Sequence, residues 1–122
     1  MKKIAINGFG RIGRVLCRIL SEYSDFQVVA INDLAEPKVL SHLLKYDSIH
    51  GRFQGNITYS NNSIFINNNE IVVLNQPQIN HLPWKDLEID VVFECTGRFK
   101  NLQENMLHIK AGAKKVLMSC PS

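Results

Sequence analysis

The chain has 122 residues, of which 45% are hydrophobic and 20% charged, and its formal net charge is +3. This composition is typical of one folded globular domain, and it excludes a disordered tail or a collagen-like chain. No apolar run approaches the ~20 residues that a membrane span needs, and the basic residues are scattered along the chain. We therefore expect neither a membrane partner nor a nucleic-acid partner.

The cysteines and histidines do not predict a cross-linked or metal-bound protein. Cys17, Cys95 and Cys120 are odd in number and unequally spaced, so they form neither a disulfide framework nor a CxxC pair. The four histidines lie on different elements without metal-ligand spacing. The N-terminus lacks the apolar stretch of a signal peptide. A reduced, cytoplasmic setting fits these features best.

In the first third of the chain, short apolar runs alternate with helical spacing. The runs predict strands at residues 3–6 and 26–31. A helix follows each strand, and Pro37 suits the first turn of the second helix. The apolar positions expected to be buried are Ile12, Val15, Leu16, Ile19 and Leu20 in the first helix and Val39, Leu40, Leu43 and Leu44 in the second.

In the middle of the chain, predicted strands follow one another without a helix between them. Strands and helices then alternate again towards the end. Strands are predicted at residues 56–59 and 63–66, and the turn residues between them indicate an antiparallel hairpin. Further strands are predicted at 70–74, 90–94 and 115–118. A helix capped by Asn101 and stopped by Gly112 lies before the last strand. Its expected buried face consists of Leu102, Met106 and Ile109.

This order of elements predicts an α/β fold. Residues 28–31, 91–93 and 116–118 are apolar at every position, as in strands covered by helices on both faces. We expect a Rossmann-type, doubly wound, mostly parallel sheet with the antiparallel hairpin inserted, as one domain over residues 1–122. The strand order for this class is 3-2-1-4-5-6, and the chain is expected to stop at the fifth parallel strand, before the last one.

The first strand runs into a glycine-rich turn. Gly8, Gly10 and Gly13 form a G-x-G-x-x-G that follows a strand and opens a helix, and Asp33 stands twenty residues past Gly13 at the end of the next strand. This is the dinucleotide-binding fingerprint in its required context. In it, the first glycine permits the turn, the second admits a pyrophosphate, and the third lets the helix pack on the strand.

Asp33 then bears on the choice of nucleotide. Its carboxylate is expected to accept hydrogen bonds from the adenosine ribose and to repel a 2′-phosphate, which favours NAD over NADP. The alternative is an ordinary strand-turn-helix connection with a solvated Asp33. Thr96 and Gly97 end a later strand at the same edge, where a hydroxyl and a glycine can approach a ribose or a pyrophosphate.

Six segments together resemble one family, phosphorylating glyceraldehyde-3-phosphate dehydrogenase. They are INGFGRIGR at 6–14, IND at 31–33, HLLKYDSIHGRF at 42–53, LPW at 82–84, ECTGRF at 94–99 and the closing KKVLMSCPS. The resemblance implies the NAD-binding half of that enzyme. The cofactor contacts it implies, together with the glycine fingerprint, are Gly8, Phe9, Gly10, Arg11, Ile12, Gly13, Asn32, Asp33, Thr96, Gly97, Phe99 and Ser119.

The same resemblance implies what this chain lacks. The family's S-C-T-T-N-C segment with the catalytic cysteine is not in the sequence, and neither is the base histidine, so no catalytic residue is assigned here. Cys120 stands where the family usually has a small alanine and is not taken for the nucleophile. The loop at 45–53 matches a subunit-contact and domain-contact region. Gln76 and Pro77 replace a charged family pattern near the adenine and are left outside the predicted site.

We therefore expect a chain that binds NAD without turnover. In the intact enzyme, expected to be a homotetramer, a sugar phosphate would be oxidised with phosphate and NAD. The isolated chain is expected to self-associate. The alternatives are the cofactor half of erythrose-4-phosphate dehydrogenase, a stand-alone NAD-binding module, and a structural fragment that cannot hold the cofactor. The family's erythrose enzymes often have N-E-L where Asn32, Asp33 and Leu34 stand, which favours the glyceraldehyde enzyme.

Overall fold

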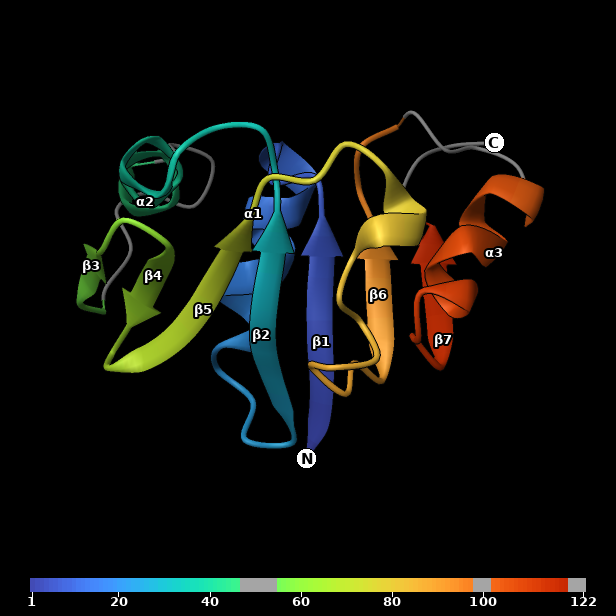
Figure 1. Ribbon diagram of the computed structural model, residues 1–122. Helices are drawn as coiled ribbons and strands as arrows, with labels where there is room; N and C mark the ends of the chain where they lie inside the picture. The colour runs from blue at the N-terminus through green and yellow to red at the C-terminus, as the bar shows by residue number, and fades with distance from the viewer. Residues whose placement is uncertain (47–54, 98–101, 119–122) are drawn as a thin grey trace.

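Figure 1 shows the computed structural model, which describes residues 1–46, 55–97 and 102–118. One seven-stranded sheet forms its centre, in the order β3-β4-β5-β2-β1-β6-β7. The strands are β1 (Lys2–Asn7), β2 (Phe26–Asn32), β3 (Ile57–Tyr59), β4 (Ser63–Ile66), β5 (Asn69–Leu74), β6 (Val91–Glu94) and β7 (Lys115–Met118). The helices are α1 (Arg11–Leu20), α2 (Pro37–Tyr46), α3 (Leu102–Lys110) and the short 3₁₀ helix η2 (Ile79–His81).

Five strands form the parallel part of the sheet. β1 pairs with β2 and β6, β2 also pairs with β5, and β6 pairs with β7, all in parallel. Taken in chain order, these five strands lie as 3-2-1-4-5, so the predicted doubly wound order is confirmed. Their carboxyl ends lie at the top of Figure 1, and the loops after β1, β2, β5 and β6 meet there.

The antiparallel part is larger than the predicted hairpin. β3 pairs with β4 as expected, but β4 also pairs antiparallel with β5. The turn between β4 and β5 consists of Asn67 and Asn68, whose φ angles are 49° and 73°. Two consecutive positive φ angles are typical of a type I′ turn, which suits a two-residue hairpin. This second hairpin attaches the first to the parallel sheet.

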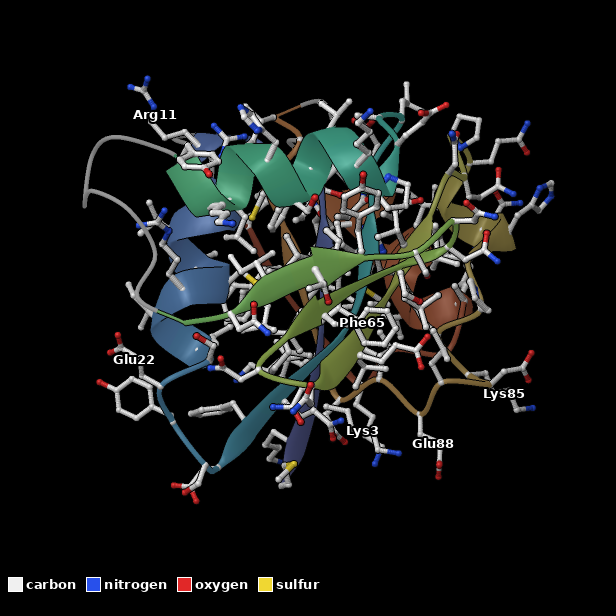
Figure 2. The ribbon with its side chains drawn as sticks, turned by 90° about the vertical axis from the view of Figure 1, so that its left-hand side faces the viewer. Lys3, Arg11, Glu22, Phe65, Lys85 and Glu88 are labelled. Atoms are coloured by element: carbon white, nitrogen blue, oxygen red, sulfur yellow. The ribbon has the colours of Figure 1, made fainter. Side chains whose placement is uncertain are left out.

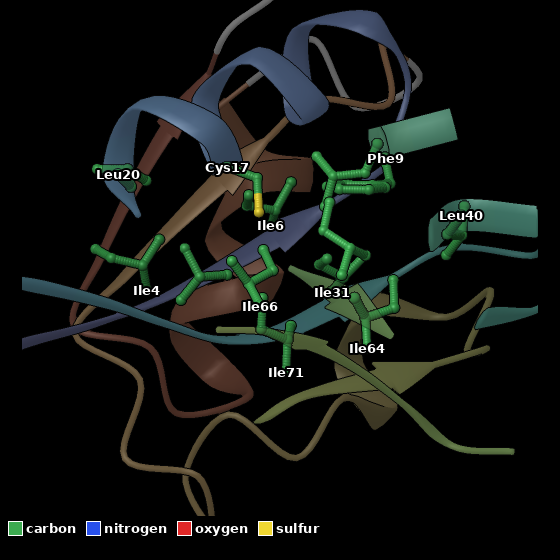
Figure 3. Close-up of a cluster of buried hydrophobic side chains, with 13 residues drawn as sticks. Ile4, Ile6, Phe9, Cys17, Leu20, Ile31, Leu40, Ile64, Ile66 and Ile71 are labelled. Atoms are coloured by element: carbon green, nitrogen blue, oxygen red, sulfur yellow. The ribbon is translucent and has the colours of Figure 1, made fainter. Parts of the chain in front are cut away.

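Alternating side chains build a core on each face of the sheet. Ile4 and Ile6 enter one core and Ala5 the other, as successive residues of a strand must. The first core lies under α1 and α2, and Figure 3 shows Cys17 and Leu20 of α1 and Leu40 of α2 gathered over the strands. The second core lies under α3 and the segment around Trp84. The sheet is therefore covered on both faces, as a doubly wound fold requires.

The predicted faces of α1 and α2 are only partly right. α1 buries Gly13, Cys17 and Leu20, whereas Ile12 and Ile19 are about half exposed. The buried stripe is turned because Gly13 lets the start of α1 pack closely on β1. α2 buries Leu40 and Leu44 as expected, but its other two predicted residues, Val39 and Leu43, line a cleft of about 490 Å³ between α2 and β3.

The expectations for α3 and β7 need larger corrections. Leu102 and Met106, predicted to be buried, are 76% and 43% exposed, and α3 instead buries the polar residues Asn105 and His108. The strand at 115–118, predicted to be covered on both faces, is the outermost strand on its side of the described sheet. Its Leu117 is 41% exposed. Gly112 has φ +120° just past α3, which agrees with its predicted part in ending the helix, and Asn101 lies outside the described residues.

Candidate functional site: a pocket at the carboxyl edge of the sheet

Gly8 makes the turn between β1 and α1. Its φ is +92°, and its N–H donates to the Asn32 carbonyl oxygen at 2.8 Å. A Cβ at this position would stand 2.7–2.9 Å from three atoms of Thr96. Both the backbone angle and the closeness of Thr96 therefore require glycine here.

The other two glycines differ in their surroundings. A Cβ on Gly13 would lie 2.5 Å from the Gly8 carbonyl oxygen, so Gly13 allows the close packing of helix and strand that was predicted. A Cβ on Gly10 would meet no atom within 4 Å, and Gly10 lines a pocket. The missing side chain of Gly10 thus leaves open space at the start of α1, where a bound group can approach the backbone.

The N-terminus of α1 suits an anion. Gly10 occupies the N-cap position and provides no side-chain cap, and the first turn contains no acidic residue. The first N–H groups of a helix have no partner within the helix, and the helix dipole adds partial positive charge there. Ile12 and Arg11 lie in this turn, and Figure 2 shows the Arg11 side chain extending outward.

Asp33 is held against the glycine-rich loop. Its Oδ2 accepts a hydrogen bond of 2.7 Å from the Phe9 N–H, and its Oδ1 accepts one of 3.0 Å from the Ala35 N–H. Each carboxylate oxygen has two lone pairs, so both oxygens keep capacity for a ligand hydroxyl. The Phe9 ring is buried in the first core, which leaves only the Phe9 backbone at the site.

The loops at the carboxyl edge enclose a pocket of about 270 Å³. It brings together five of the predicted site residues, namely Gly8, Gly10, Asn32, Asp33 and Thr96. Gly13 lies behind the loop as a packing residue, and Gly97, with φ +73°, follows Thr96. Phe99 and Ser119 lie outside the described residues.

The opposite wall of the pocket includes residues that the sequence did not assign. Gln76 and Pro77, which follow β5, line the pocket, and so do Asn7, Leu34 and Cys95, the chain neighbours of Gly8, Asp33 and Thr96. Gln76 and Asn32 bond reciprocally: the Gln76 N–H donates to Asn32 Oδ1, and Asn32 Nδ2 donates to the Gln76 carbonyl oxygen, each at 2.8 Å. The Asn32 side chain therefore builds the wall of the pocket. In the sequence, the position of Asn32 at the end of an apolar strand was the feature that could have indicated this role in the pocket lining.

A buried carboxylate lies beneath Thr96. Glu94 Oε2 accepts hydrogen bonds from the Thr96 N–H at 2.9 Å and from the Thr96 hydroxyl at 2.6 Å. Since both polar hydrogens of Thr96 point inward, its Oγ1 meets a ligand as an acceptor. It can therefore accept a hydrogen bond from a ribose hydroxyl, one of the two groups that the sequence led us to expect here.

Glu94 is ionised despite its burial. Burial raises the pKa of Glu94, but hydrogen bonds from His108, Thr96 and Asn7 outweigh burial and hold this pKa below its ordinary value. In the sequence, a charged residue directly after the apolar run 91–93 was the signal that could have indicated such partners. Within residues 1–46, 55–97 and 102–118, no cluster of metal-ligating side chains occurs and no helix is long and apolar enough to cross a membrane.

Comparison with known proteins now identifies the family. The model of the family "Glyceraldehyde 3-phosphate dehydrogenase, NAD binding domain" matches residues 2–102. The chain belongs to this family. Over the whole chain it is 51% identical to glyceraldehyde-3-phosphate dehydrogenase of Thermotoga maritima and 50% identical to that of Clostridium acetobutylicum. It spans 37% and 36% of the length of these two relatives.

The residues at the pocket fit the family's cofactor, NAD. The open space at Gly10 and the uncapped start of α1 suit a pyrophosphate. The remaining acceptor capacity of Asp33 suits ribose hydroxyl groups. The fold prediction and the NAD prediction are therefore confirmed, and nothing in these comparisons favours the erythrose enzyme.

Proposed function

We propose that this chain is the cofactor domain of a glyceraldehyde-3-phosphate dehydrogenase, an enzyme that oxidises an aldehyde with phosphate and NAD. The observation that carries the proposal is the pocket in which the open Gly10 and the fixed Asp33 face the same space. The identity of about half the residues with two such enzymes supports it.

Each part of the pocket contacts a different part of NAD in this proposal. NAD supplies the nicotinamide that accepts a hydride from the substrate. The backbone at Gly10, Arg11 and Ile12 holds the pyrophosphate, and Asp33 accepts from the adenosine ribose. We assign Gln76 and Pro77 to the adenine and Thr96 and Gly97 to the nicotinamide side. Phe99 and Ser119, outside the described residues, are proposed as further cofactor contacts on the family resemblance alone.

We propose no catalytic residue within residues 1–122. The two relatives are more than twice as long as the chain, so the catalytic cysteine, the base histidine and the sugar-phosphate site have room in the remainder. We propose that residues 1–122 form the NAD-binding domain and show no turnover alone. The intact enzyme is proposed to be a cytoplasmic homotetramer. Cys17 and Cys95, which are not in a disulfide, agree with a reducing compartment.

Titration calorimetry of the chain with NAD and NADP tests the proposed function. Because the Asp33 carboxylate repels a 2′-phosphate and accepts from a 2′-hydroxyl, NAD should bind more tightly by about 1–3 kcal/mol. Asp33→Ala should shrink this difference, while Asp25→Ala, at an exposed position on the opposite edge, should leave it unchanged. Equal affinity of the unaltered chain for both nucleotides would contradict the assignment of Asp33.

A further inference from the structure

Helix α3 buries a histidine instead of the apolar face that its sequence predicts. The His108 side chain has no exposed surface, and both of its ring nitrogens have partners. The Trp84 indole N–H donates to His108 Nδ1 at 2.9 Å, and His108 Nε2 lies 2.9 Å from Glu94 Oε1. The burial of this polar residue therefore depends on two specific hydrogen bonds rather than on apolar packing.

The tryptophan determines where the histidine carries its hydrogen. An indole nitrogen can only donate, so His108 Nδ1 must accept and bears no hydrogen. The hydrogen of the ring is then on Nε2 and is donated to Glu94 Oε1. A doubly protonated ring would place an N–H against the Trp84 N–H. In this network His108 therefore acts through Nε2 as a donor to Glu94.

Glu94 connects this donor to the glycine-rich loop. Its Oε1 accepts from His108 and from Asn7 Nδ2, the latter at 2.6 Å, while its Oε2 accepts both polar hydrogens of Thr96. Thr96 stands so close to Gly8 that a Cβ there would lie within 2.9 Å of it. The Glu94 carboxylate therefore holds both polar groups of the residue that lies against Gly8.

The network also reaches the other wall of the pocket. Asn7 Oδ1 accepts a hydrogen bond of 2.7 Å from Asn32 Nδ2, and Asn32 holds Gln76. Asn7, Asn32 and Gln76 all line the pocket, whereas His108 does not. His108 lies at the interior end of a chain of hydrogen bonds that ends on both sides of the cofactor site.

We propose that His108 is a positioning residue for NAD, which acts through Glu94 to hold Thr96 and Asn7 in the arrangement that the cofactor requires. This inference rests on the NAD-binding function proposed above. It adds that a residue outside the pocket controls the affinity of the pocket, and that its Nε2 hydrogen is the atom through which it does so.

Two substitutions separate the two hydrogen bonds of His108. His108→Asn keeps an oxygen near the position of Nδ1 for Trp84 but is too short to reach Glu94. His108→Gln extends an N–H toward Glu94 and loses the acceptor for Trp84. Each variant loses one buried bond, so both should lower the melting temperature by a similar amount. Lys110→Gln, at an exposed position of the same helix, is the control.

NAD affinity distinguishes positioning from simple support of the fold. We expect His108→Asn to weaken NAD binding about tenfold and His108→Gln to change it less than about threefold. Affinities that follow the melting temperatures of the two variants, or an unchanged affinity in His108→Asn, would contradict the proposal. If the unaltered chain does not bind NAD, the proposed function fails first; binding by the chain with no loss in His108→Asn removes only this inference.

A second measurement tests the proposal on the unaltered chain and does not depend on the folding of a variant. Nitrogen NMR of the chain labelled with ¹⁵N-histidine reports which ring nitrogen carries hydrogen. At pH 7 we expect the His108 ring to carry hydrogen on Nε2 alone, in the presence and absence of NAD. Hydrogen on Nδ1, or on both nitrogens, would overturn the hydrogen-bond direction on which the proposal depends.

Discussion

Gly10 and Gly13 stand three residues apart at the start of α1, and a methyl group added to each meets different surroundings. At Gly10 it projects into open space beside the pocket, while at Gly13 it lies 2.5 Å from the Gly8 carbonyl oxygen. Gly10→Val should therefore meet no clash at its Cβ and lower the free energy of unfolding by less than about 1 kcal/mol, because valine is a poorer N-cap residue than glycine, while NAD affinity falls by at least about tenfold. Gly13→Ala should lower the free energy of unfolding by about 1–3 kcal/mol, because packed backbone must move.

Calorimetry and urea unfolding of both variants check this difference. The N-cap φ of Gly10 is −78°, which any residue adopts, so the stability lost in Gly10→Val should stay below the loss in Gly13→Ala. A Gly10→Val variant that binds NAD like the parent would mean that the cofactor does not approach the loop at this point.

Part of the stability of the fold depends on the ionised Glu94 and is lost in acid. Because its hydrogen bonds outweigh burial and hold its pKa below the ordinary value of 4.5, the folded chain binds this proton less tightly than the unfolded chain does. The stability that Glu94 contributes is therefore complete above pH 4.5 and is lost as the pH falls through the lower folded pKa.

Urea unfolding between pH 7 and pH 3 measures this component. We expect Glu94→Gln to cost about 2–3 kcal/mol at pH 7, since its amide cannot accept all the donors around it, and to flatten the loss of stability below pH 5. The exposed Glu22→Gln is the control. An acid profile that is unchanged in Glu94→Gln would show that other carboxylates account for the transition.

At the scale of elements, strands and the glycine-rich turn followed from the sequence because their signals are local. An apolar run of four residues predicts a strand, and a glycine-rich motif predicts a turn, without knowledge of any distant residue. The helix faces were less predictable. The buried side of α3 is set by contacts outside the helix, from Asn105 to the Met118 sulfur and from His108 to Glu94 and Trp84, and helical periodicity contains no information about them.

The candidate site shows the same division. Gly8, Gly10 and Asp33 were predicted because their spacing is a fingerprint. Gln76 was left outside the predicted site because it departs from the family pattern. Its place in the pocket lining depends on a hydrogen bond to Asn32, 44 residues away in the sequence, which no local pattern contains. Residues that act through long-range contacts leave no periodic pattern, and here they make up one wall of the pocket.

The turn between β4 and β5 depends on a backbone angle that most residues adopt at a cost. Asn68 has φ 73°, and asparagine tolerates this region better than alanine does. Asn68→Ala should lower the free energy of unfolding by about 1 kcal/mol, whereas Asn68→Gly should retain it. Asn61→Ala, at an exposed position in the other turn, should change it by less than about 0.5 kcal/mol. Equal losses in both alanine variants, measured by urea unfolding, would contradict the turn assignment.

At the scale of the whole molecule, β7 is expected to mediate self-association of the 122-residue chain. It is the outermost strand on its side of the described sheet, and Leu117 and Met118 are each 41% exposed. Such an edge offers N–H and C=O groups to another strand. Sedimentation velocity over a concentration series should show dimers or larger species, and Leu117→Lys should shift them toward monomer. A monomer at hundreds of micromolar would contradict this expectation.

The central claim is that NAD occupies the pocket between the glycine-rich loop, Asp33 and Gln76. An NMR titration of the ¹⁵N-labelled chain with NAD measures this directly, because each backbone amide reports on its own surroundings. We expect the largest shift changes at Gly10, Arg11, Ile12 and Asp33, and none in the cleft between α2 and β3 that Leu43 lines. Changes confined to that cleft, or an unchanged spectrum at saturating NAD, would contradict the account.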